Sequence, residues 1–227
     1  MDAILPEFSP LEDYMGYLSN ASSLPNGFAT GTASGIFVSI EAPAISPLPV
    51  KVAVVHLTDD PTNSWVVCFI QNKFLGSPIK VGCSRLGVGG PLQAIVVNNK
   101  VSNICSGGDG VADSDMVCEA MAKALDLSGG SKMVLPSSTG VIRWRLLAKE
   151  LAEEVIPKAV DNLQTESTLN ATRDIMTTDR YPKLRSKTLS NGDRLVGVAK
   201  GAGMVEPIIA TMICYLMTDA TIDKVTL

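Results

Sequence analysis

The chain has 227 residues, of which 46% are apolar and 19% charged, which is the balance of a soluble protein that buries a core. Its formal charge of −4 and pI near 5.0 argue against nucleic acid as a main partner, because binding phosphates needs clustered Lys and Arg. Five scattered cysteines form no Cys-x-x-Cys pair and His56 is the one histidine, so neither a disulfide framework nor a metal site is indicated. We therefore expect no metal and no cofactor.

The first twenty residues are acidic and contain no Lys or Arg, which does not fit a secretory signal or a transit peptide. The longest apolar run, 207–217, is about half of the roughly 20 residues that cross a bilayer. We expect a soluble protein that makes no membrane contact and lies in the cytoplasm, with an organelle left open as an alternative.

The first 50 residues are rich in Pro, Gly, Ser and Ala and predict an extended lead-in with one short strand near 35–40. Apolar runs with β-branched residues, bounded by turn clusters, then predict three strands, at 50–57, 65–70 and 92–98.

A helical pattern follows Asp109, because Val117, Met121 and Leu125 recur every four residues. Asp113 and Ser114 are the candidates for its N-terminal cap. A strand-like run at 132–135, a helix over 143–160, a hairpin at the Asn-Gly turn of 191–192 and a final apolar helix over 207–216 complete the expected elements. The interleaving favours the α/β class, and no linker divides 1–227 into independent domains.

Three polar clusters occur where an apolar core would favour Leu or Val: Ser137-Ser-Thr-Gly140, Met176-Thr-Thr-Asp179, and Lys200-Gly-Ala-Gly203 ahead of Ala210-Thr211. Hydroxyl groups and backbone amides at the start of a helix can hold a developing oxyanion. Each cluster also has a simple structural interpretation, namely an N-cap, a capping turn and a strand-to-helix turn. Singly, none of them is specific.

In this order and at this spacing, the clusters resemble the ornithine acetyltransferase family, the bifunctional glutamate N-acetyltransferases of arginine biosynthesis. The resemblance runs from about residue 25 to the end and includes the Asn-, Gly- and Asp-rich stretch 98–113. It implies an α/β layered sandwich of the self-cleaving type, of which this chain would hold the first half. It also implies cleavage between Ala210 and Thr211, with 1–210 as the first chain and 211–227 as the start of a second.

The resemblance further implies the roles of single residues in acetyl transfer from N-acetylornithine to glutamate. The freed Thr211 would be the nucleophile, with its own α-amine as the base, and would also contact substrate. Thr139 and Gly140 would donate to the oxyanion, and Thr177 and Lys200 would bind substrate. The expected partners are these small molecules and a complementary second chain or further copies of this one.

Some residues depart from the family pattern. Arg143 and Leu147 replace an expected glycine and proline, and Ile208-Ile209 replaces an Asn-Met pair beside the scissile bond. Only sixteen residues follow Thr211, so the second chain would be a stub. Two alternatives therefore stay open: a non-catalytic binding or interaction module, and an amidohydrolase or aminopeptidase with the same acyl-enzyme chemistry.

Overall fold

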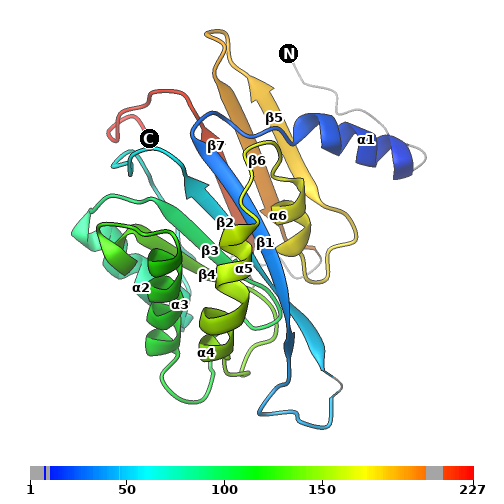
Figure 1. The fold of residues 1–227 in the computed structure, drawn as a ribbon, viewed down its shortest axis with the longest axis vertical. Coiled ribbons are helices and arrows are strands. Elements are labelled where there is room, and N and C mark those ends of the chain that lie inside the picture. The colour runs from blue at the N-terminus through cyan, green and yellow to red at the C-terminus, as the bar shows by residue number, and fades with distance from the viewer. Residues whose placement is uncertain (1–7, 9–10, 46, 203–211) are drawn as a thin grey trace.

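The structure is a computed structural model that describes residue 8 and residues 11–45, 47–202 and 212–227. Its strands form two sheets that pack face to face (Figure 1). The four-stranded sheet has the order β1 (Phe28–Phe37), β2 (Leu48–Leu57), β3 (Ala94–Asn98) and β4 (Val134–Ser138). The three-stranded sheet has the order β5 (Lys183–Thr188), β6 (Arg194–Lys200) and β7 (Ile213–Thr218).

Alternating residues of β2 supply two different cores, because successive side chains of a strand point to opposite faces. Val52 and Val54 face the helices, whereas Ala53 and Val55 face the three-stranded sheet. The helical layer consists of α2 (Ser77–Val88), α3 (Gly110–Ala124), the short helix η1 (Gly130–Met133), and a continuous helical segment made of α4 (Ala148–Glu150), η2 (Leu151–Val155) and α5 (Ile156–Asp161). Two further helices, α1 (Leu11–Ala21) and α6 (Leu169–Asp174), contribute to the core between the sheets.

The strands predicted at 50–57 and 92–98, the helix after Asp109 and the Asn-Gly hairpin are confirmed. The cap of α3 is corrected, because the Asp109 carboxylate accepts hydrogen bonds from the amides of Val111 and Ala112. Ser114 is instead buried and hydrogen-bonds to the carbonyl of Gly110. The lead-in is also more ordered than expected, since it contains α1 and the ten-residue strand β1.

Two predicted elements are wrong. Residues 65–70 form no strand, because no neighbouring strand pairs with them; Trp65 instead anchors the segment by packing against Leu92 and Leu135. The final helix is replaced from Ile213 onward by β7, and its earlier part lies outside the described residues. Short apolar runs fit a buried strand as well as a buried helix, so periodicity alone did not separate the two.

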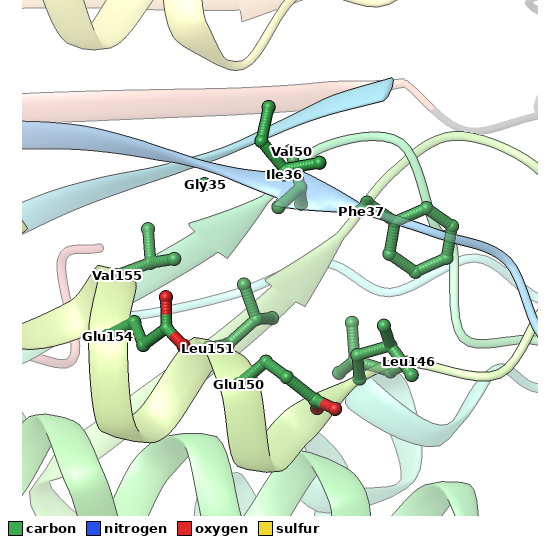
Figure 2. A pocket seen from close by; sticks show the side chains of 10 residues that line it. Gly35, Ile36, Phe37, Val50, Leu146, Glu150, Leu151, Glu154 and Val155 are labelled. Carbon is green, nitrogen blue, oxygen red and sulfur yellow. The ribbon is translucent and has the colours of Figure 1, made fainter. Parts of the chain in front are cut away.

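The predicted helix over 143–160 begins later, at Ala148, and contains the π-helical turn η2. Pro157 explains the irregularity, because proline has no N–H to donate within the helix. A small pocket, whose volume is about 60 Å³, lies between this segment and the ends of β1 and β2, and Figure 2 shows the side chains around it. Apolar side chains line most of it, and Glu150 and Glu154 are the two acidic residues of the lining. None of the predicted site residues lines it.

We expect Asp109→Ala to lower the free energy of unfolding by about 1 kcal/mol, because two amides at the start of α3 lose their acceptor. Urea denaturation measures the change. Glu119→Ala is the matched control on the exposed face of the same helix, and an equal loss in both variants would contradict the assignment of the cap.

Candidate functional site

Thr139 lies just beyond the end of β4 and is completely buried. Its backbone N–H donates to the carbonyl of Asn98 at 3.0 Å, which continues the pairing of β4 with β3. The Ser138 hydroxyl donates to the Asn98 side-chain oxygen at 2.5 Å. The two contacts fix the backbone that leads into Thr139, and neither of them uses its hydroxyl group.

Gly140 follows with a φ of +135°, which favours glycine. A Cβ atom at this position would also overlap the backbone of Lys100. The next amide, of Val141, donates to the Lys100 carbonyl at 2.7 Å, which holds the two segments together. Within the described part of the chain, no acceptor is bound to the amide of Gly140.

Lys200, the last residue of β6, joins two hydroxyl groups from distant parts of the sequence. Its ammonium group donates to the Thr139 hydroxyl at 2.8 Å and to the Thr177 hydroxyl at 3.0 Å, and the residue is only 4% exposed. An ammonium group can only donate, so both hydroxyl oxygens accept and both hydroxyl protons are directed elsewhere. Thr139 is therefore a hydroxyl donor polarised by a neighbouring positive charge.

The loop that carries Thr177 is held from two sides. The Asp179 carboxylate, whose side chain is fully buried, accepts from the Gly201 amide at 2.7 Å and pairs with Lys183 at 2.5 Å. On the other side, the Asn99 side chain donates to the carbonyl of Asp174 at 2.9 Å. Asp179 thus ties the Thr177 loop to the residue directly after Lys200.

Burial lowers the pKa of Lys200 from its ordinary value, an effect that the nearby Asp179 carboxylate opposes. Burial alone would raise the pKa of Asp179, but hydrogen bonds from Lys183 and from the amides of Gly201 and Thr177 hold it below its usual range. Asp179 therefore stays ionised at neutral pH and keeps a counter-charge near Lys200.

Tyr215 adds a polar group that the sequence analysis missed. It lies on β7 two residues beyond Ile213, the residue that pairs with Lys200. Its hydroxyl group is buried beside Ser137, two residues before Thr139. Burial raises the pKa of Tyr215, so the phenol remains a donor.

The structure thus brings together Thr139, Thr177 and Lys200, with Gly140 adjacent to Thr139. Ala210 and Thr211 lie outside the described residues. The sequence does place Thr211 two residues before Ile213, the pairing partner of Lys200. Asn98, Asn99 and Asp179 were not predicted as site residues, although their position in or beside the Asn- and Thr-rich motifs was a usable signal.

The described residues meet neither the requirements of a metal site nor those of a membrane-spanning helix. In these ranges, no group of three or more His, Cys, Asp and Glu side chains is arranged to hold a metal ion. Among the helices of the same ranges, none has the length and apolar character needed to cross a membrane.

The layered fold is that of solved ornithine acetyltransferase structures. The Mycobacterium tuberculosis ornithine acetyltransferase, solved in complex with ornithine, superposes with a TM-score of 0.69 at 27% identity and covers 85% of this chain and 96% of that one. The Bacillus halodurans arginine biosynthesis bifunctional protein ArgJ superposes with a TM-score of 0.59 at 24% identity, over 86% of this chain and 94% of that one, and supports the fold alone.

The sequence comparisons identify the family. The ArgJ family model matches residues 49–227, so the chain belongs to the ArgJ family. The arginine biosynthesis bifunctional protein ArgJ of Chlorobaculum tepidum is 33% identical over 209 residues, covering 90% of this chain and 48% of the relative. The mitochondrial ArgJ of Schizosaccharomyces japonicus is 31% identical over 221 residues, covering 93% and 48%. The chain therefore spans about half the length of the curated relatives it matches.

We expect the Gly140→Ala variant to be destabilised by roughly 1–3 kcal/mol, because a side chain is strained at this φ and meets the Lys100 backbone. Thermal and urea unfolding measure the loss. Gly107→Ala is the control, since Gly107 is exposed and has open space around it. Equal stability of the two variants would rule out the steric requirement at Gly140.

The lowered pKa of Lys200 predicts a pH dependence of stability. Between the folded pKa and the ordinary value of 10.5, the unfolded chain binds more protons than the folded one, so the Lys200 contribution to stability rises with pH. We expect the free energy of unfolding of the wild type, minus that of Lys200→Met, to increase as the pH rises through this window. Urea titrations between neutral pH and pH 10.5 test it, and a difference that stays flat or falls would contradict the assigned burial effect.

Proposed function

We propose that this chain is the amino-terminal half of an acetyltransferase that moves an acetyl group from N-acetylornithine to glutamate in arginine biosynthesis. The observation that carries the proposal is the buried Lys200 ammonium group, which is hydrogen-bonded to Thr139 and Thr177. Membership of the ArgJ family and the fold shared with an ornithine acetyltransferase support it. We further propose that 1–227 is one domain, with the cleavage site between Ala210 and Thr211.

In the first step, the Thr211 hydroxyl oxygen attacks the acetyl carbonyl carbon of N-acetylornithine, and the freed α-amine of Thr211 takes the hydroxyl proton. The amide C–N bond then breaks, ornithine leaves with that proton, and an acetyl ester remains on Thr211. The Thr139 hydroxyl and the Gly140 amide stabilise the negative oxygen of the tetrahedral intermediate. This role fits the structure, because neither the Thr139 hydroxyl proton nor the Gly140 amide is donated to an acceptor among the described residues.

In the second step, the glutamate amine attacks the ester carbon and gives up a proton, which the Thr211 α-amine passes to the Thr211 oxygen as the C–O bond breaks. N-acetylglutamate is released and the free threonine is restored. Lys200 and Thr177 bind substrate, and the Lys200 ammonium group suits the carboxylate that N-acetylornithine and glutamate share. The enzyme therefore needs no metal and no cofactor for group transfer.

We also propose that a complementary segment or chain completes the protein. The chain spans 48% of each of two curated relatives but 96% of the solved M. tuberculosis chain. The solved chain is thus similar in length to this one. That similarity supports the proposal that the complete protein consists of two polypeptides.

The denatured intact mass of the purified chain, before and after incubation with N-acetylornithine, tests this proposal. We expect the 23.9 kDa chain to break after Ala210 and the Thr211 peptide to gain an acetyl group. Thr211→Ala should do neither. Hydrolysis of N-acetylornithine without transfer to glutamate would favour the amidohydrolase, and an intact, unmodified chain would favour a binding module.

Thr177→Ala removes one acceptor of Lys200, and we expect kcat/KM for acetyl transfer to fall about 10-fold or more, because hydrogen bonds to charged groups contribute roughly 1.5–3 kcal/mol. Thr178→Ala is the matched control, since the neighbouring threonine is exposed and makes no contact with Lys200. Equal loss in both variants would argue against the role of Thr177.

A further inference from the structure

An open groove of about 570 Å³ lies where β1, β2, α5 and the end of α6 meet, on the side of the molecule where Figure 1 shows α5 and α6 beside β1. Its volume falls within the roughly 300–1,000 Å³ of small-molecule sites. None of the residues Thr139, Gly140, Thr177 and Lys200 lines it. The groove is therefore separate from the Lys200 site.

The charged residues of the groove are two lysines and two aspartates. Lys51 pairs with one carboxylate oxygen of Asp174 at 2.7 Å. Lys158 and Asp161 are exposed on α5 and form no ion pair with any residue that the structure describes. A lining that is neutral overall but carries both signs fits a ligand with both charges better than a simple anion or cation.

The backbone of β1 adds hydrogen-bonding groups to this lining. Thr30 exchanges two hydrogen bonds with Gln164, at 2.9 and 3.0 Å, across the edge of β1 that faces away from β2. Because these groups alternate along a strand, Thr32 and Ser34 present their N–H and C=O groups to the same edge. The Thr32 carbonyl accepts from Asn162 at 3.0 Å, whereas no described residue reaches the backbone of Ser34.

We propose that this groove binds a free α-amino acid, at a site distinct from the proposed acetyl-transfer site. The α-carboxylate is bound by the Lys158 ammonium group and the Ser34 amide. The ammonium group is bound by Asp161, and a second ammonium group, such as that of ornithine, by the remaining oxygen of Asp174. The ligand gives Lys158 and Asp161 a charged partner each. It also forms hydrogen bonds with the free edge of β1.

One buried side chain connects the groove with the loop of the other site. The Asn99 side chain accepts from the Lys51 amide at 2.8 Å and donates to the Asp174 carbonyl at 2.9 Å. Asp174 lies three residues before Thr177, which accepts from Lys200. The Asn99 side chain also donates to the carbonyl of Met176 at 3.4 Å, so a ligand that contacts Asp174 touches the segment that Asn99 holds just before Thr177.

Calorimetric titration with L-ornithine tests the proposal, with the 227-residue chain carrying Lys200→Met so that the Lys200 site is disabled. We expect this chain to bind L-ornithine, and the triple variant with Lys158→Met and Asp161→Asn to bind it about tenfold more weakly or not at all. Lys149→Met in the same background is the matched control, because Lys149 lies on α4 of the same helical segment, is 74% exposed and does not line the groove. A parallel ¹⁵N–¹H spectrum should show shifts at Ser34, Asp161 and Thr177.

Loss of binding in the groove variant, with binding retained in the Lys149 control, would support the proposal. No binding of L-ornithine by the Lys200→Met chain would overturn it, as would binding that is equally strong in the groove variant. Binding lost equally in the Lys149 control would also overturn it, because it would reflect surface charge in general. This experiment does not measure acetyl transfer. A negative result for the groove therefore leaves the proposed function standing, and a failure of acetyl transfer leaves the groove proposal standing.

Discussion

The candidate site depends on one buried positive charge. Removing the Lys200 ammonium group from water is costly, and the structure offsets that cost with two hydroxyl acceptors and the nearby Asp179 carboxylate. This requirement joins β4, the Thr177 loop and β6, which come from separate stretches of the sequence. The packing of the two sheets and the polar site between them are therefore parts of one arrangement.

Around Lys200, the backbone is fixed by side chains whose own role is positional. Asn98 holds the end of β4, Asn99 holds the loop before Thr177, and Asp179 ties that loop to Gly201. With those groups in place, the Thr139 hydroxyl proton and the Gly140 amide remain for a ligand. A rigid set of donors of this kind stabilises developing charge without reorganising during the reaction.

The sequence predicted the elements whose signals are local. The four-residue spacing of Val117 and Met121 gave α3, the apolar run at 50–57 gave β2, and the Asn-Gly turn gave the hairpin of β5 and β6. It failed where a neighbour decides the outcome: residues 65–70 lack a partner strand, whereas β7 is a strand because β6 pairs with it. A short apolar run such as Ile213–Thr218 fits a buried helix and a buried strand equally well until its partner is known.

The order of the polar motifs was enough to indicate the family and to single out Thr139, Gly140, Thr177 and Lys200, because motif residues and their spacing are properties of the chain itself. The sequence did not show that Lys200 would contact both threonines, or that Asp179 and Asn99 would hold them in place. Those contacts join residues up to 75 positions apart, and only the packing of the two sheets brings them within hydrogen-bonding distance. The same holds for the groove beside β1, which exists because α5 and α6 end at the free edge of that strand.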